Sequence, residues 1–207
     1  MTTVEKILAH RIIAIIRLDE YARAVEIARA LHKGGIQVLE FTLTGRGALE
    51  AIANVRKDMG DALCVGVGSA LDVDESNAAI DAGAEFVVMP IVNPRVLHAC
   101  VNRNTPVLAG GFTPTELWTA HEAGAELVKL FPAHLGGPGY VQAVLAPMPF
   151  LKLVPTGGVN AENLRAYLSA GAVAVGVGGN LISKQAVVSG AFQEITAAAR
   201  ALVQRSG

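Results

Sequence analysis

The chain has 207 residues, of which 52% are hydrophobic and 17% are charged, and its formal net charge is −1. That length and apolar content suffice for one sizeable core, so we expect a single compact domain. The charge balance excludes the basic face that binding to nucleic acid or to an anionic membrane surface requires. The apolar run at residues 12–16 is too short to span a bilayer, and the N-terminus lacks the apolar core of a signal peptide. We therefore expect a soluble, cytoplasmic protein that binds neither nucleic acid nor membrane.

The chain opens with a segment typical of a short amphipathic helix, at about residues 2–10. After it, one kind of junction recurs: a helical stretch ends in small residues that include glycine, and an apolar strand follows directly. Glycine just past a helix end permits the left-handed conformation that turns the chain into a strand. Four such junctions predict a serial α/β array, and they lie at residues 32–40, 81–90, 122–129 and 169–176.

Eight apolar segments are predicted to be strands, and segments with helical patterning alternate with them. Strands that are apolar throughout suit a parallel sheet covered on both faces. Eight β/α units in a chain of this length predict a (β/α)8, or TIM, barrel that forms one domain over residues 1–207. The strands are expected at residues 12–17, 37–43, 63–67, 86–89, 106–108, 127–131, 151–155 and 172–177, and the helices include 20–31, 48–57, 113–123, 162–169 and 185–203.

A doubly wound open sheet is the alternative fold. Such a sheet commonly carries a dinucleotide fingerprint of three glycines directly after a strand. Two Gly-Val-Gly segments, at residues 66–68 and 176–178, begin in that way, but Leu71 and Leu181 take the place of the third glycine. The barrel is therefore the preferred fold.

Two ionisable residues lie within apolar predicted strands. Lys129 is near the end of a strand that stops at Pro132, and Glu40 lies inside the run Val-Leu-Glu-Phe. A buried ammonium tends to lose its proton, and a neutral amine is a nucleophile. The alternative is that each side chain turns outward and pairs at the surface. If both face the inside of a small barrel, they form an imine-forming amine beside a general acid/base.

The carboxyl ends of barrel strands and the loops after them carry the active site in this fold. Glycine pairs follow the seventh and eighth predicted strands, where exposed backbone amides commonly hold phosphate. Each pair is expected to precede a helix whose dipole favours an anion. The residues at the strand ends are Arg17, Glu40, Thr42, Thr44, Ser69, Pro90, Gly110, Gly111, Lys129, Thr156, Gly157, Gly158, Gly178, Gly179 and Asn180.

The segments at residues 39–44, 66–69, 128–133 and 155–158 resemble, in order, those of the 2-keto-3-deoxy-6-phosphogluconate (KDPG) and 2-keto-4-hydroxyglutarate (KHG) aldolases. These are class I, Schiff-base aldolases, and the resemblance runs from about residue 12 to about residue 182. It implies cleavage of KDPG, KHG or both to pyruvate and an aldehyde, which is glyceraldehyde 3-phosphate or glyoxylate. It also implies a homotrimer and no dissolved cofactor.

Carried onto this chain, the resemblance makes Lys129 the imine lysine and Glu40 the acid/base. The keto-acid pocket would be lined by Ser69, Pro90, Phe131 and Thr156, and the phosphate loops would contain Gly157, Gly158, Gly178, Gly179 and Asn180.

The chain departs from the family pattern at two positions. Thr44 stands where the family often has an arginine that holds the substrate carboxylate, so Arg17 or Arg46 is expected to supply the cation. Asn180 stands where a serine is common. The segment at residues 136–140 is also similar to the 2-keto-3-deoxy-6-phosphogalactonate aldolases, which are the alternative substrate branch.

The remaining metal-type ligands and thiols suggest no second chemistry. The five histidines are scattered, so we expect no metal site, although His134 follows the lysine strand and is a candidate substrate contact. Cys64 and Cys100 are isolated, which predicts buried, reduced thiols. A phosphate-binding isomerase or epimerase would need paired acids or metal-binding histidines at the strand ends. A non-catalytic keto-acid sensor would need neither reactive group, and both are present.

Overall fold

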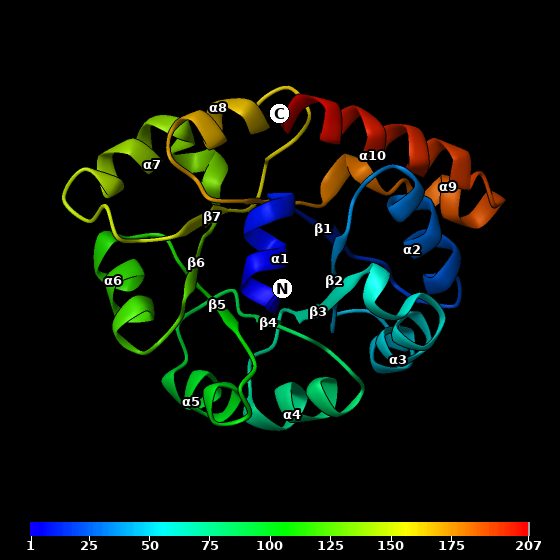
Figure 1. Ribbon diagram of the computed structural model, residues 1–207, viewed down its shortest axis with the longest axis horizontal. Helices are drawn as coiled ribbons and strands as arrows, with labels where there is room; N and C mark the ends of the chain where they lie inside the picture. Colours follow the sequence, from blue (N-terminus) through cyan, green and yellow to red (C-terminus); the bar gives the residue numbers. More distant parts are fainter. Residues whose placement is uncertain (207) are drawn as a thin grey trace.

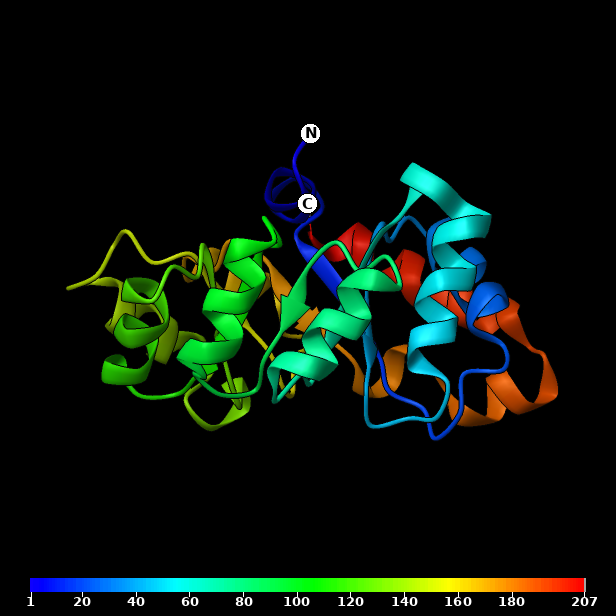
Figure 2. The same ribbon diagram turned by 90° about the horizontal axis from the view of Figure 1, so that it is seen from below.

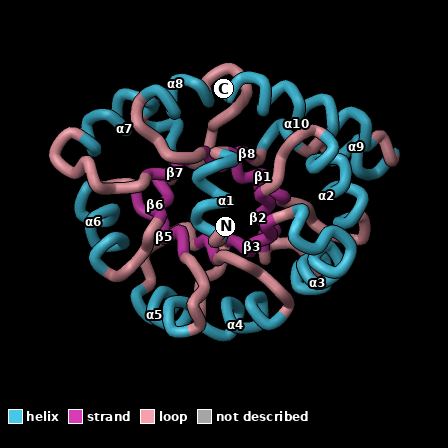
Figure 3. The backbone as a smooth tube through the Cα atoms, viewed as in Figure 1, coloured by secondary structure: helices cyan, strands magenta, loops and turns pink. Residues whose placement is uncertain are grey.

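The computed structural model describes residues 1–206, except for the side chain of Asn180. Within this part of the chain, eight parallel strands form one sheet, and helices surround it as an outer ring (Figures 1 and 3). The strand order is β7-β6-β5-β4-β3-β2-β1-β8. The strands are β1 (Ile12–Ile16), β2 (Val38–Thr42), β3 (Cys64–Gly68), β4 (Val87–Val88), β5 (Val107–Gly111), β6 (Leu127–Leu130), β7 (Leu153–Pro155) and β8 (Val175–Val177).

The two edge strands, β7 and β8, meet and close the sheet. The amide of Val173 donates to the carbonyl of Leu153 at 3.0 Å, and Thr156 forms an isolated parallel bridge with Gly176. This pair is joined by an isolated bridge and not by a continuous ladder such as the one between β5 and β6. The prediction of a single (β/α)8 barrel is confirmed.

The helices begin and end close to the predicted boundaries, with one exception. Residues 185–203 were predicted to form one helix, and this is wrong, because Gly190 adopts a left-handed conformation (φ 76°) that ends one helix before the next begins. The helices are α1 (Thr3–His10), α2 (Ala24–Lys33), α3 (Ala48–Met59), α4 (Val73–Asp81), α5 (Pro94–Asn102), α6 (Pro114–Glu122), α7 (Gly137–Leu145), α8 (Leu164–Ser169), α9 (Lys184–Ser189) and α10 (Phe192–Ser206).

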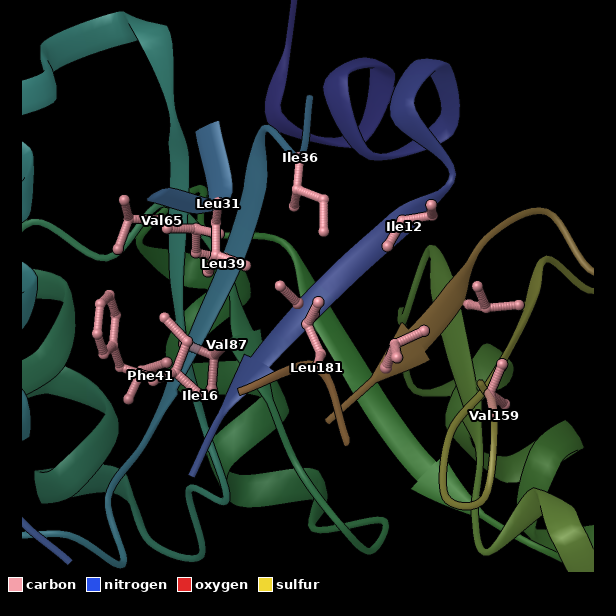
Figure 4. Packing of buried hydrophobic residues seen from close by; sticks show 14 of the residues in the cluster. Ile12, Ile16, Leu31, Ile36, Leu39, Phe41, Val65, Val87, Val159 and Leu181 are labelled. Atoms are coloured by element: carbon pink, nitrogen blue, oxygen red, sulfur yellow. The ribbon is translucent and has the colours of Figure 1, made fainter. Parts of the chain in front are cut away.

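Side chains alternate between the two faces of each strand and form two separate apolar clusters. On β2, Leu39 and Phe41 point outward and pack under the helices, and the side chains of Leu31 and Leu39 lie together between α2 and the strand (Figure 4). Val38 points inward and belongs to the smaller cluster that fills the barrel. Every other strand position is therefore available to an inward functional group.

Helix α1 covers the N-terminal end of the barrel (Figure 2). Its residues Val4 and Ile7 belong to the cluster inside the barrel, and a capping box between Thr2 and Glu5 stabilises its first turn. The opposite, C-terminal end of the strands is thus the end at which a substrate can enter. Of the helices in the described part of the chain, none combines the length and apolarity that crossing a membrane would require.

Candidate active site

Lys129 on β6 and Glu40 on β2 both face the interior of the barrel. Each lies two residues after an inward apolar side chain, Leu127 and Val38 respectively, so the alternation of the strand places it on the same face. Lys129 is 4% exposed and Glu40 is 2% exposed. The fold therefore places an amine and a carboxyl group in one apolar chamber.

Inward glycines provide the room for these groups. A Cβ at Gly68 would collide with the carboxylate of Glu40, and a Cβ at Gly66 would collide with the ring of Phe86. Gly176 on β8 leaves the same kind of space for the side chain of Thr156. The narrow barrel thus holds Glu40 only because the neighbouring strand β3 has no side chain at that level.

The environment favours the neutral form of both groups. Burial lowers the pKa of Lys129; the negative charge of Glu40 opposes this shift, and the positive charge of Arg17 adds to it. Burial raises the pKa of Glu40, against the opposing charges of Lys129 and Arg17. A neutral amine can attack a carbonyl carbon, and a protonated carboxyl group can donate a proton to the oxygen that leaves.

A cavity of about 470 Å³ opens at the C-terminal ends of β1, β7 and β8. Its wall combines one cation with two glycine loops and an apolar side. The lining residues are Ile15, Arg17, Phe131, Thr156, Gly157, Gly158, Val159, Asn160, Gly178, Gly179 and Ile182.

Phe131 connects the cavity to the buried amine. Its ring lines the cavity, and the Nζ atom of Lys129 lies 5.1 Å from the ring centroid. Thr156 is 5% exposed and lines the wall directly after β7, the strand that pairs with β6. The cavity therefore lies next to the buried amine, with the ring of Phe131 between them.

The glycine loop after β7 is tied to the turn that follows the lysine strand. The amide of Ala133 donates to the carbonyl of Thr156 at 2.8 Å, and the amide of His134 donates to that of Gly157 at 3.0 Å. Gly157 and Gly158 both have positive φ values, 92° and 80°. This geometry requires glycine and leaves the loop backbone unshielded.

Neither glycine pair leads directly into an α-helix. Helix α8 begins only at Leu164, after a turn in which Asn163 donates to the carbonyl of Gly158 at 2.9 Å. After β8, residues Gly179–Leu181 form a single 3-10 turn. Because the dipole effect falls off within one turn, the backbone amides of the loops contribute more here than helix dipoles do.

The two candidate arginines lie in different places. Arg17 lines the cavity and continues the inward face of β1. Arg46 is 84% exposed and lies 3.4 Å from Glu20 at the surface. Thr44, which replaces the family arginine, is exposed, and its hydroxyl lies 2.9 Å from that of Thr42. Of these candidates, only Arg17 borders both the cavity and the buried pair.

The other predicted pocket residues lie at the strand ends without lining this cavity. Ser69 and Pro90 are half-buried, directly after β3 and after β4. The side chain of Asn180 lies outside the described residues. Sequence reasoning missed Asn160 and Ile15, which line the cavity, and it missed the space that Gly68 provides. The one available signal was the alternation of glycine and valine in β3, which places two glycines on the same face.

No group of three or more metal-ligating side chains occurs among the described residues. A buried lysine with a depressed pKa beside a buried carboxyl group, at the open end of a (β/α)8 barrel, defines a barrel enzyme built for imine chemistry.

Comparison with known proteins gives the family. The model of the KDPG and KHG aldolases matches residues 4–198. The chain is 37% identical over 95% of its length to the 2-dehydro-3-deoxy-phosphogluconate aldolase of Treponema pallidum, of which it covers 94%. It is 30% identical over 82% of its length to the 2-dehydro-3-deoxy-6-phosphogalactonate aldolase of Escherichia coli, of which it covers 83%.

A solved structure agrees with these relatives. The KDPG aldolase of Legionella pneumophila, with pyruvate captured at low pH as a covalent carbinolamine intermediate, has a TM-score of 0.90 and 28% identity, and the match covers 98% of both chains. The protein belongs to the KDPG and KHG aldolase family. It is accordingly a class I aldolase, a carbon–carbon lyase, and the sequence-based identification is confirmed.

Proposed function

We propose that this aldolase cleaves KDPG, and KHG less efficiently, through a Schiff base on Lys129. The observation that carries the proposal is the buried Lys129–Glu40 pair, in which burial favours the neutral amine and the protonated acid. The names of the relatives support the phosphorylated gluconate substrate. The phosphogalactonate branch is supported by a relative with lower identity and coverage, so it stays the alternative.

The mechanism starts with the attack of the Lys129 amine on the C2 carbonyl carbon of the substrate. Glu40 donates a proton to the oxygen, and the carbinolamine loses water to give a protonated imine. Glu40, now a carboxylate, accepts the proton of the C4 hydroxyl. The C3–C4 bond breaks, its electrons pass into the imine, and an aldehyde and an enamine result. Protonation at C3 and addition of water then release pyruvate and the free lysine.

The substrate carboxylate is assigned to Arg17, because this cation lines the cavity and its charge reaches both reactive groups. A guanidinium can bind a carboxylate through two parallel hydrogen bonds. Thr156 and Phe131 position the keto acid against Lys129, and Ser69 and Pro90 border the same end of the barrel.

The distal phosphate is assigned to the backbone amides of the two glycine loops. Four of these glycines line the cavity, and none of the two loops' residues is lysine or arginine. Asn180 is proposed as a further donor. A site without a lysine or arginine of its own implies moderate phosphate affinity and tolerance of the shorter, unphosphorylated substrate. The residues proposed for phosphate are Gly157, Gly158, Gly178, Gly179 and Asn180.

Trapping with borohydride tests the proposal. Reduction in the presence of pyruvate should inactivate the enzyme and attach pyruvate carbons to the peptide that contains Lys129. The same treatment without pyruvate is the control, and it should leave the peptide mass unchanged. A label on Lys152, the next lysine along the chain, or on any other lysine would refute the assignment.

We also propose that the enzyme acts as a homotrimer in the cytoplasm. The family resemblance supports the trimer, and Trp118 and Phe150, 42% and 48% exposed, form an aromatic surface group with ring centroids 5.8 Å apart. The free thiols of Cys64 and Cys100 support a reducing compartment. Native mass spectrometry measures the assembly directly, and a monomer at micromolar concentration would refute the trimer.

A further inference from the structure

We propose that His134 is a specificity-determining residue that contacts the distal phosphate of the substrate. The inference rests on the phosphate site proposed above. It concerns a side chain that the catalytic mechanism does not use, on the turn directly after the lysine strand.

The position of His134 is set by the phosphate loop itself. Its amide donates to the carbonyl of Gly157 at 3.0 Å, so its backbone is fixed to the glycine pair. Its Cβ lies 2.5 Å, and its Nδ1 atom 3.5 Å, from the place that a Cβ at Gly158 would occupy. The Cβ of His134 therefore packs against Gly158, with the imidazole starting directly behind it, and Gly158 itself lines the cavity.

The residues of the two glycine loops supply no charged donor for phosphate, so a neighbouring side chain such as His134 could supply a further donor. The residues of the two glycine loops supply amides but no ammonium or guanidinium group. Arg17, at the end of β1, is assigned to the carboxylate, and Lys184 lies 2.8 Å from Asp19 in a surface ion pair. His134 is exposed to solvent.

An imidazole suits this position chemically. It offers an N–H donor to phosphate whether it is neutral or protonated, and a hydrogen bond to a doubly charged group is stronger than one to a neutral group. The shorter substrate KHG ends in a carboxylate closer to C4, so it would not reach a side chain beside Gly158. His134 should thus favour phosphorylated substrates without affecting the chemical step.

Kinetic analysis of His134→Ala tests this role. Alanine keeps the Cβ that packs against Gly158, so the loop keeps its shape. We expect kcat/KM for KDPG to fall about tenfold or more, the loss typical of one hydrogen bond to a charged group. We expect kcat/KM for KHG and the trapping of pyruvate by borohydride to stay within about twofold. His134→Gln, which keeps an N–H donor, should recover part of the loss, and His98→Ala on α5 is the matched control.

Two kinetic outcomes would overturn the proposal. Equal losses on both substrates would mean that His134 only holds the loop, and no loss on either would mean that it does not contact phosphate. A readout without turnover separates this from the proposed function: inorganic phosphate should shift the NMR signals of the His134 ring in both the wild type and Lys129→Ala. Absence of that shift would refute the phosphate contact of His134 alone, whereas failure of pyruvate trapping in the wild type would refute the aldolase mechanism.

Discussion

The inside of the barrel contains ionisable side chains, whereas the rim after β7 and β8 is formed by uncharged glycine loops. Inside, Lys129 and Glu40 are ionisable side chains that burial shifts towards their neutral forms. At the rim, uncharged glycine loops line a cavity that solvent reaches. Covalent chemistry requires a desolvated amine, whereas a phosphate that must enter and leave is better held by fixed dipoles near water. One end of the barrel therefore combines a buried pair of ionisable groups with a solvent-accessible rim, which is the proposed phosphate site.

The largest effect on activity should come from Lys129→Met, which keeps the length of the side chain and removes the amine. We expect turnover and the pyruvate adduct to disappear, because the amine that forms the imine is gone. Methionine burial without charge should also stabilise the fold, since an ammonium in an apolar site costs free energy.

The same variant gives a pH test with a defined sign. The folded pKa of Lys129 lies below its ordinary value of 10.5, so between the two values the unfolded chain binds more protons than the folded chain. The free energy of unfolding of the wild type should therefore rise with pH, relative to Lys129→Met, up to about 10.5. Urea unfolding of both proteins at several pH values measures this difference. A difference that is constant with pH would show that the amine is not desolvated.

Glu40→Gln should have the next largest effect. Glutamine has nearly the same shape but carries no transferable proton, so turnover should fall ~10²–10⁴-fold while imine formation with pyruvate slows. Circular dichroism should show a folded protein. Glu50→Gln, on the exposed face of α3, is the matched control. Unfolding of Glu40→Gln would instead assign this carboxyl group a structural role.

Gly68→Ala should reduce activity without touching either reactive group. The new Cβ would collide with the carboxylate of Glu40, so overpacking should cost about 1–3 kcal/mol of stability. Displacing a catalytic group by about 1 Å can slow turnover ~10²-fold. Gly139→Ala is the control, because no atom lies within 4 Å of its added Cβ. Equal behaviour of the two variants would contradict the tight fit around Glu40.

Sequence patterns could predict the barrel because each strand and each glycine junction carries a local signal. Neighbouring residues determine both the apolar strand segments and the glycine turns. The structure contains the predicted strands, and it has positive φ at Gly35, Gly83, Gly124 and Gly171. The break at Gly190 was missed because the apolar pattern continues across it, and only the backbone conformation reveals the turn.

The site was only partly predictable from the sequence. Strand alternation and the family resemblance pointed to Lys129 and Glu40, but alternation alone does not say which of the two faces of a strand lies inside the barrel. The choice between Arg17 and Arg46 depends on contacts across the fold. Arg46 approaches Glu20 because the β1 and β2 loops bridge there, and no local pattern encodes that pairing.

The smallest effect is expected from replacing these two arginines, which tests whether Arg17 at the cavity or Arg46 at the surface binds the substrate carboxylate. Arg17→Ala should raise KM for pyruvate in the condensation direction by ~10–100-fold, the loss of a charged hydrogen-bonded partner. It should also raise the pKa of Lys129, because the positive charge of Arg17 lowers it, so the rate of imine formation should fall most at low pH.

Arg46→Ala should leave both quantities unchanged, since its partner Glu20 is at the surface. If Arg46→Ala alone raises KM, the loop must move towards the cavity when substrate binds. If neither variant does, the carboxylate is held by hydroxyl and backbone donors and not by an arginine.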